Sequence, residues 1–205
     1  MTPRIVCYGD SNTYGYDGCD PFGGRLPANA RWVDLLGGML GCECLNCGLN
    51  GRTVPHVPRT VEADLALLRR HAPCTLVIVL LGTNDLLTDT EPEETAERMR
   101  RFLTRLKETL PETAVLLAAP PPVEDYGEGY AFAFGELAGL YAELAGELGV
   151  GFVDTAGWGV QTAGDGVHFS ARGHRIFAVK MAQTVRALLM NRRRITGCQK
   201  ARFVL

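Results

Sequence analysis

A serine follows the first apolar run of the chain, in the stretch GDSNTYG (residues 9–15) directly after RIVCY. At such a junction between strand and helix, the Ser11 hydroxyl and its own N–H can face the same cleft. His168 could take the serine proton, because the unperturbed pKa of histidine lies near neutrality. Asp165 stands three residues earlier, close enough to hold the imidazole in the required tautomer and to stabilise its cation. We therefore predict Ser11, His168 and Asp165 as nucleophile, base and acid of an acyl-transfer reaction.

Acyl transfer also needs hydrogen-bond donors for the negative charge that develops on the carbonyl oxygen. Three donors are available in the loops of the predicted fold: the N–H of Ser11, the N–H of Gly51 in GLNGRT, and the side-chain amide of Asn84 in GTND. Losing one such donor typically lowers turnover by about 100- to 1000-fold. The predicted oxyanion hole is therefore Ser11, Gly51 and Asn84.

Each of these residues also has a purely structural interpretation. Gly-Asp-Ser is a common turn, Asn84 and Asp85 could close a turn and cap the next segment, and Gly51 could serve backbone shape alone. Arg52 could pair with a surface acid, and His168 could be a partly buried histidine with its hydrogen bonds satisfied. The remaining histidines have no acid at a comparable spacing and are interpreted as structural: His56, His71 and His174. The catalytic interpretation depends on the four segments occurring together.

The elements that must position these residues are those of an α/β protein. Short apolar runs alternate with longer amphipathic stretches, which is typical of a parallel sheet with helices on both faces. The predicted strands are Ile5–Tyr8, Cys44–Cys47, Leu76–Leu81, Ala114–Ala118 and Gly151–Val153. Loops after parallel strands open at one edge of the sheet. GDSNTYG, GLNGRT, GTND and the segment DGVHFS before the last helix are therefore expected to share one cleft.

Helix signals mark two of the longer stretches. Thr90 and Glu93 have the spacing of a capping box, with Pro92 in the first turn of the helix that follows. A final helix is expected to begin near Ser170, a natural N-cap. The stretch PPPVEDYGEG (residues 120–129) is predicted as a loop. We predict a single domain over residues 1–190, followed by a basic tail over 191–205 that is either a frayed helix end or disordered.

The composition excludes several classes of protein. The chain has 205 residues and a formal net charge of -2, whereas binding to nucleic acid or to a membrane surface normally needs a basic excess. No apolar run approaches the roughly 18 residues of a membrane span. The first strand begins by about Arg4, which leaves no room for a signal peptide. We therefore expect a cytoplasmic protein with neither a nucleic-acid nor a membrane partner.

The seven cysteines are odd in number and scattered, which favours reduced thiols over a disulfide framework. The cluster CECLNC could form a metal site with three thiolates and His56, but zinc sites usually take their ligands in two separated pairs. Its alternation instead favours small apolar residues in a strand, because free cysteine buries readily. We expect no metal site. The cluster consists of Cys42, Cys44 and Cys47.

The four segments, in this order, resemble the conserved blocks of the SGNH hydrolases, also called GDSL-type esterases. Ser11 matches the family's nucleophile, and Asp165 and His168 match its Asp-x-x-His motif. Gly51 and Asn84 match the glycine and asparagine of the middle blocks. The similarity is closest to the arylesterase and acyltransferase branch, through RW (residues 31–32), GLNGRT, LLGTND, PPP (residues 120–122) and DGVHF. It covers about residues 5 to 190. GDSN has asparagine where the family name has leucine, which leaves the serine in place.

The resemblance implies a flavodoxin-like, three-layer αβα fold with five parallel strands in the order 2-1-3-4-5. It also implies hydrolysis of small acyl or aryl esters without metal or organic cofactor, with acyl transfer to alcohols or peroxide in some members. One alternative is a carbohydrate O-deacetylase that uses the same site. Another is a non-catalytic binding module for a nucleotide or flavin, although GDSNTYG lacks the glycine spacing of phosphate-binding loops. The expected partner is a small-molecule ester, and the oligomeric state is left open between monomer and homo-oligomer.

Overall fold

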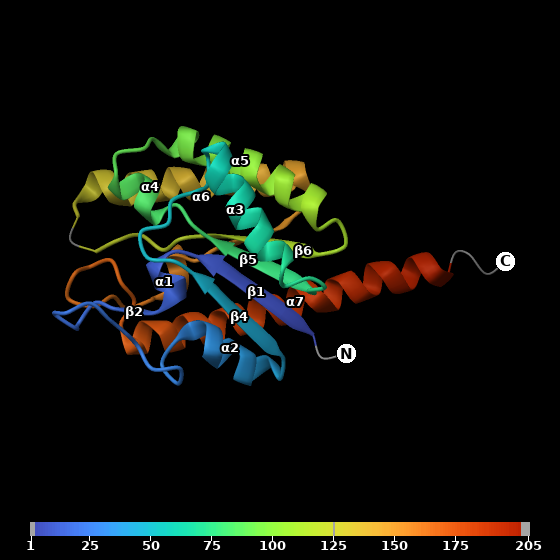
Figure 1. Ribbon diagram of the computed structural model, residues 1–205, viewed down its shortest axis with the longest axis horizontal. Helices are drawn as coiled ribbons and strands as arrows, with labels where there is room; N and C mark the ends of the chain where they lie inside the picture. The colour runs from blue at the N-terminus through green and yellow to red at the C-terminus, as the bar shows by residue number, and fades with distance from the viewer. Residues whose placement is uncertain (1–2, 125, 202–205) are drawn as a thin grey trace.

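The computed structural model describes residues 3–201 except residue 125, with side chains described as far as residue 190. Its centre is a five-stranded sheet in the order β4-β1-β5-β6-β7, and every neighbouring pair of strands is parallel (Figure 1). Ranked along the chain this order is 2-1-3-4-5, so the predicted topology is confirmed. The strands are β1 (Arg4–Gly9), β4 (Glu43–Gly48), β5 (Leu76–Leu80), β6 (Ala114–Ala119) and β7 (Gly151–Asp154).

Helices cover both faces of the sheet (Figure 1). One face carries α3 (Pro58–Arg69), α5 (Pro92–Thr109) and α6 (Glu128–Leu148), and the other carries α2 (Trp32–Leu40) and α7 (Ala171–Ala201). Alternate strand residues supply the two cores: Val77 and Val79 pack in the first, and Leu76 and Ile78 in the second. All five residues of β5 are buried, as expected of a continuous apolar strand covered on both faces.

The start of α5 differs from the predicted capping box. The N-cap is Glu91, which makes no side-chain capping bond, and Pro92 occupies the first turn. The N–H of Thr90 instead donates to the carbonyl oxygen of Asp85 at 3.0 Å. Thr90 therefore belongs to the turn that closes the short helix α4 (Thr83–Leu87), and α5 begins one residue later than a threonine cap would place it.

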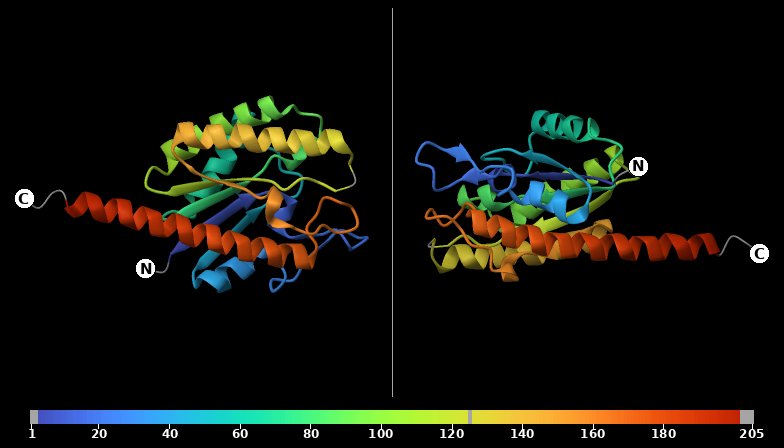
Figure 2. Two further views of the ribbon diagram at one scale, coloured as in Figure 1. Left: turned by 180° about the vertical axis from the view of Figure 1, so that it is seen from behind. Right: turned by 90° about the horizontal axis from the view of Figure 1, so that it is seen from below.

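The final helix begins as predicted, because the Ser170 hydroxyl accepts the N–H of Gly173 at 3.1 Å. It then continues to Ala201 and projects beyond the body of the sheet and helices (Figure 2). The predicted boundary at residue 190 thus falls within a continuous helix, and residues 202–205 lie outside the described part. Helix α6 begins at Glu128, so the last two residues of the loop predicted over residues 120–129 are helical.

The cysteines with described side chains are free thiols: Cys7, Cys19, Cys42, Cys44, Cys47 and Cys74. The Sγ atoms of Cys42 and Cys44 lie 3.8 Å apart, and both residues are partly buried at the β4 edge of the sheet. Within the part of the chain that the structure describes, no three histidine, cysteine, aspartate or glutamate residues are grouped so that they could hold a metal ion. Of the described helices, none is both long and apolar enough to cross a membrane.

Candidate active site

Ser11 opens a one-turn helix, α1 (Ser11–Tyr14), at the carboxyl end of β1. The residue before it, Asp10, has an extended backbone and caps the helix by accepting the N–H of Asn12 at 2.9 Å. Gly15 ends the helix in a left-handed conformation. This tight strand–turn–helix arrangement places the serine at the start of the helix, where backbone N–H groups are not used within the helix.

The structure brings the three predicted reacting side chains into one hydrogen-bonded chain. His168 Nε2 lies 3.0 Å from Ser11 Oγ, and His168 Nδ1 lies 2.7 Å from Asp165 Oδ2. The other carboxylate oxygen, Asp165 Oδ1, accepts the N–H groups of Val167 at 3.0 Å and of His168 at 2.9 Å. Ser11 and His168 are 157 positions apart in the sequence, so only the fold brings them together.

The electrostatics of this series of hydrogen bonds determine which nitrogen of the His168 imidazole carries the hydrogen. Partial burial raises the pKa of Asp165, but the hydrogen bonds from the His168 ring and from the two N–H groups outweigh it and leave the pKa lowered. An ionised carboxylate can only accept hydrogen bonds, so Nδ1 of His168 carries the hydrogen. In the neutral ring, Nε2 is therefore left with its lone pair toward the Ser11 hydroxyl.

Two residues of the first loop flank His168 in a way that the sequence did not indicate. The Tyr16 ring lies 4.4 Å from the imidazole, centroid to centroid, at an angle of 44°. Tyr16 belongs to a small antiparallel hairpin of β2 (Tyr16–Asp17) and β3 (Gly24–Arg25). At Gly18, an added Cβ would lie 2.6 Å from Asp165 Oδ2 and 3.1 Å from His168 Cβ. Glycine is therefore needed there for the hairpin to pack against Asp165 and His168.

The predicted oxyanion residues lie in the next two loops. Gly51 is exposed and has φ +70°, a left-handed conformation that glycine adopts without steric cost. Asn84, in the first turn of α4, donates from Nδ2 to the carbonyl oxygen of Arg52 at 3.0 Å. The second and third loops are thus joined to each other, whereas the described hydrogen bonds connect neither Gly51 nor Asn84 with Ser11.

Arg52 is not the surface residue that its sequence context allowed. Its side chain is only 8% exposed and pairs with Asp64 of α3 at 3.3 Å. Nη1 donates to the carbonyl oxygens of Gly9 at 2.7 Å and Cys47 at 2.5 Å, and the guanidinium lies 4.3 Å from the centre of the Tyr8 ring. Arg52, the residue after Gly51, therefore connects the carboxyl ends of β1 and β4 to α3.

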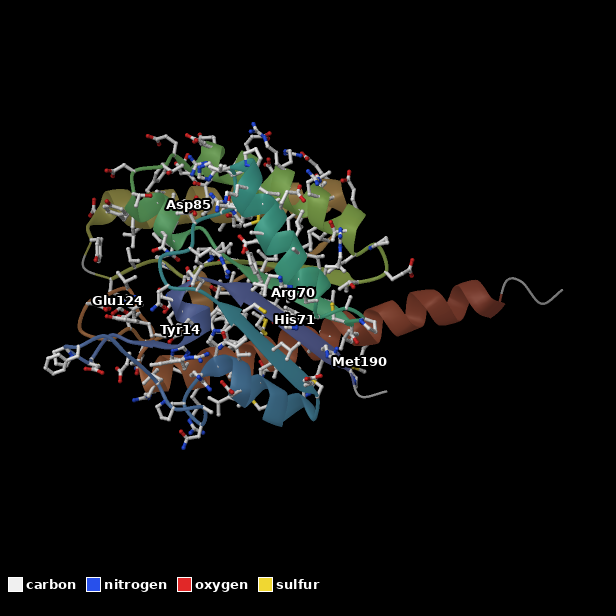
Figure 3. All side chains as sticks on the ribbon, in the orientation of Figure 1. Tyr14, Arg70, His71, Asp85, Glu124 and Met190 are labelled. Carbon is white, nitrogen blue, oxygen red and sulfur yellow. The ribbon has the colours of Figure 1, made fainter. Side chains whose placement is uncertain are left out.

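Asp85, the residue after Asn84, is fully buried and does not belong to the hydrogen-bonded series of Ser11, His168 and Asp165. Its carboxylate accepts the N–H of Val54 at 2.9 Å and pairs with Arg98 at 3.3 Å. Burial raises the pKa of Asp85, against the effects of these two partners. Figure 3 places Asp85 by α4, on the side of the sheet covered by α3, α5 and α6. It supports the segment that follows Gly51 and Arg52, and its carbonyl closes the turn after α4.

The predicted loop over residues 120–129 reaches the segment that carries Asp165. The N–H of Glu124 donates to the carbonyl oxygen of Gly166 at 2.7 Å, and the Glu124 carboxylate accepts the hydroxyl of Thr162. Figure 3 shows Glu124 and Tyr14 at the same end of the molecule. The loops after β1 and β6 therefore border the same site as the Asp165–His168 segment.

His174, interpreted from sequence as structural, is buried in the first turns of α7. Its Nδ1 accepts the N–H of Trp32 at 3.3 Å, and Nε2 has no described partner. Burial, with smaller effects of the Arg31 and His168 charges, lowers the pKa of His174 to about 4. The ring is therefore neutral at neutral pH and packs edge-on against Phe169.

The sheet order and these contacts define a doubly wound α/β protein with a serine, a histidine and an aspartate hydrogen-bonded in sequence at the carboxyl edge of the sheet. The sequence model of the GDSL-like lipase/acylhydrolase family matches residues 7–176. The chain belongs to this family.

Solved structures of similar proteins share both the fold and part of the sequence. The aryl esterase of M. smegmatis is 31% identical, with a TM-score of 0.77 over 91% of this chain and 99% of that chain. A carbohydrate acetylesterase from Sinorhizobium meliloti is 30% identical, with a TM-score of 0.79 over the same shares of the two chains.

The thioesterase 1/protease 1/lysophospholipase L1 of Escherichia coli is 29% identical over 148 residues. The match covers 71% of this chain and 63% of that protein, so the chain spans less than two thirds of the length of this relative.

Proposed function

We propose that the protein is a serine esterase that hydrolyses small acyl or aryl esters through an acyl-enzyme. The observation that carries the proposal is the chain of contacts from Ser11 Oγ to His168 Nε2 at 3.0 Å and from His168 Nδ1 to Asp165 at 2.7 Å. A hydroxyl is a weak nucleophile unless a base in hydrogen-bond reach takes its proton. Membership of the GDSL-like family favours this activity over a non-catalytic binding module.

In the first half-reaction, Ser11 Oγ attacks the ester carbonyl carbon as its proton moves to His168 Nε2. The carbonyl electron pair moves onto oxygen, and Asp165 stabilises the imidazolium. When the tetrahedral intermediate collapses, the alcohol or phenol leaves with the proton from Nε2, and Ser11 carries the acyl group. Water then gives a proton to Nε2 and attacks the acyl carbon. The second tetrahedral intermediate collapses, the bond from the acyl carbon to Ser11 Oγ breaks, the carboxylic acid leaves, and Nε2 returns the proton to Ser11 Oγ. In acyl transfer, an alcohol or peroxide would take the place of water as the nucleophile in this second half-reaction.

The developing oxyanion is assigned to the N–H groups of Ser11 and Gly51 and to the amide of Asn84. The amide nitrogen has two hydrogens, and one is bound to the Arg52 carbonyl. The second is then available to substrate in an orientation that this bond restricts. Donors held in place before the reaction stabilise the transition state without a reorganisation cost.

A carbohydrate O-deacetylase is the second candidate, supported by the likeness to the Sinorhizobium meliloti acetylesterase. The same residues would act, and only the alcohol part of the ester would differ. Rates on acetylated xylan fragments and on aryl acetates, measured with the same preparation, distinguish the two. We further propose a cytoplasmic enzyme whose partner is a small-molecule ester.

The test compares hydrolysis of p-nitrophenyl acetate and p-nitrophenyl octanoate by the wild type and by Ser11→Ala. We expect faster cleavage of the acetate and loss of the enzymatic rate in Ser11→Ala. A Ser11→Ala protein that keeps the wild-type rate would show that Ser11 is not the nucleophile. Faster cleavage of the octanoate would contradict the preference for small acyl groups.

A further inference from the structure

The side chain of Asn12 connects the serine turn with both neighbours of His168. Its Nδ2 donates to the carbonyl oxygen of Val167 at 3.2 Å, and its Oδ1 accepts the N–H of Phe169 at 2.8 Å. Asn12 is 5% exposed. Both ends of one buried amide are therefore bonded to the backbone on either side of the predicted base.

The backbone of Asn12 is itself held in place. Its N–H donates to the buried carboxylate of Asp10 at 2.9 Å, and its carbonyl oxygen accepts the indole N–H of Trp32 at 3.0 Å. Trp32 is fully buried and packs against Phe177 of α7. The Asn12 side chain thus extends from a fixed point, next in sequence to Ser11.

The other contacts of His168 do not provide the same connection. Asp165 lies in the same segment as His168, so it orients the ring within that segment but does not set its distance from Ser11. Tyr16 packs against the ring in a tilted arrangement, which restricts the imidazole without a directional bond. The two Asn12 bonds instead relate the backbone of His168 to the backbone of Ser11.

We propose that Asn12 is a positioning residue that sets the Ser11–His168 distance by holding Val167 and Phe169. This inference rests on the proposed function, in which Ser11 and His168 are nucleophile and base. A leucine at position 12 has a similar shape but no polar atoms, so it would leave the Val167 carbonyl and the Phe169 N–H without their partner. A displacement of about 1 Å between reacting groups can cost about 100-fold in rate.

The test uses Asn12→Leu, with Asn12→Asp as the conservative variant that keeps the acceptor for Phe169. Ser11 is labelled with diisopropyl fluorophosphate: Oγ attacks phosphorus, fluoride leaves, and the serine proton passes to His168. Mass spectrometry gives the labelling rate.

For Asn12→Leu we expect the labelling rate and kcat on p-nitrophenyl acetate to fall about 100-fold. KM should change less than about threefold, because the lost interaction acts in the transition state. Asn12→Asp should recover part of the rate.

Asn46→Leu is the matched control. The Asn46 amide also bonds to the serine helix, through Nδ2 to the Thr13 carbonyl oxygen at 2.8 Å, and its Oδ1 accepts the N–H of Gly48 at 3.0 Å. It thus connects α1 to β4, and its described hydrogen bonds do not include the His168 segment. We expect Asn46→Leu to unfold at a lower temperature but to label within about threefold of the wild-type rate.

The outcomes separate this inference from the proposed function. Folded Asn12→Leu that labels at the wild-type rate overturns the inference, as does an equal loss of labelling in Asn46→Leu. If Asn12→Leu does not fold, Asn12→Asp decides, and labelling of Asn12→Asp at the wild-type rate overturns the inference.

A wild type that is not labelled at Ser11 contradicts the proposed function. In that case the 15N chemical shift of His168 Nε2, which reports the hydrogen bond to Ser11, tests the role of Asn12. If this chemical shift is the same in Asn12→Leu as in the wild type, the inference about Asn12 is overturned.

Discussion

The guanidinium of Arg52 donates a hydrogen bond to the carbonyl oxygen of Gly9, two residues before the predicted nucleophile, at 2.7 Å. The backbone carbonyl of the same arginine accepts the amide of Asn84 at 3.0 Å. One residue with a buried side chain therefore connects the strand end that leads to Ser11 with the side chain assigned to the oxyanion. Stability and activity are expected to depend on it together.

Arg52→Met keeps much of the side-chain length but removes the charge and the donors. It leaves the Asp64 carboxylate and two carbonyl oxygens without their partner, and breaking a buried ion pair in this way costs about 3 kcal/mol of unfolding free energy. Urea unfolding measures the loss. The control is Arg101→Met, at an arginine whose side chain is 71% exposed and pairs with Glu97. Its effect should stay below about 1 kcal/mol, and equal losses in the two variants would refute the role of Arg52.

Gly18→Ala tests how closely the hairpin packs against Asp165 and His168, the proposed acid and base. The new methyl group would meet Asp165 Oδ2 at 2.6 Å, so the hairpin or the carboxylate must move. We expect kcat on p-nitrophenyl acetate to fall by about tenfold or more, because displaced catalytic groups lose rate steeply. Gly38→Ala is the control, since no atom lies within 4 Å of an added Cβ there. In α2 it should keep full activity and gain some helix stability; a Gly18→Ala enzyme with wild-type kcat would contradict the prediction.

The pH dependence of stability should contain a contribution from Asp10. Burial raises its pKa from 3.8 to about 6. Because the folded state binds this proton more tightly than the unfolded state, the contribution is favourable at low pH and is lost as the pH rises through about 6. From about pH 8 to about pH 4 the wild type should gain about 2 kcal/mol relative to Asp10→Asn. Urea unfolding of both proteins across this range measures the difference, and parallel pH curves would contradict it.

The contribution of His174 to the pH dependence of stability should have the opposite sign. Its pKa is lowered from 6.5 to about 4 by burial, so the unfolded state takes up the proton first as the pH falls. The contribution of His174 is fully present above about pH 6.5 and is lost as the pH falls toward about 4, by roughly 2 to 3 kcal/mol. His174→Gln, which does not titrate, should lose less stability over the same range. His71→Gln, at a partly exposed position, is the control, and an unchanged acid dependence in His174→Gln would disprove the prediction.

The five strands could be predicted because each is a short local apolar run, as expected of strands in a covered parallel sheet. Their order followed from the resemblance to the SGNH hydrolases and not from the pattern of the runs. The residues Ser11, Asp165 and His168 were recognisable because GDSNTYG, GLNGRT, GTND and DGVHFS occur together and in order, whereas none of these segments is diagnostic by itself. The capping box at Thr90 was wrong because a contact outside the helix, from its N–H to the Asp85 carbonyl, competed with the local pattern.

The sequence alone determined which residues we propose for ester hydrolysis and at which edge of the sheet they lie. Only the tertiary structure decided how they are held. Asn12, Tyr16 and Arg52 act on groups from other segments, and Asn12 reaches Phe169 across 157 positions. No local pattern encodes such a contact, because the direction of a buried side chain follows from the packing of all the elements around it.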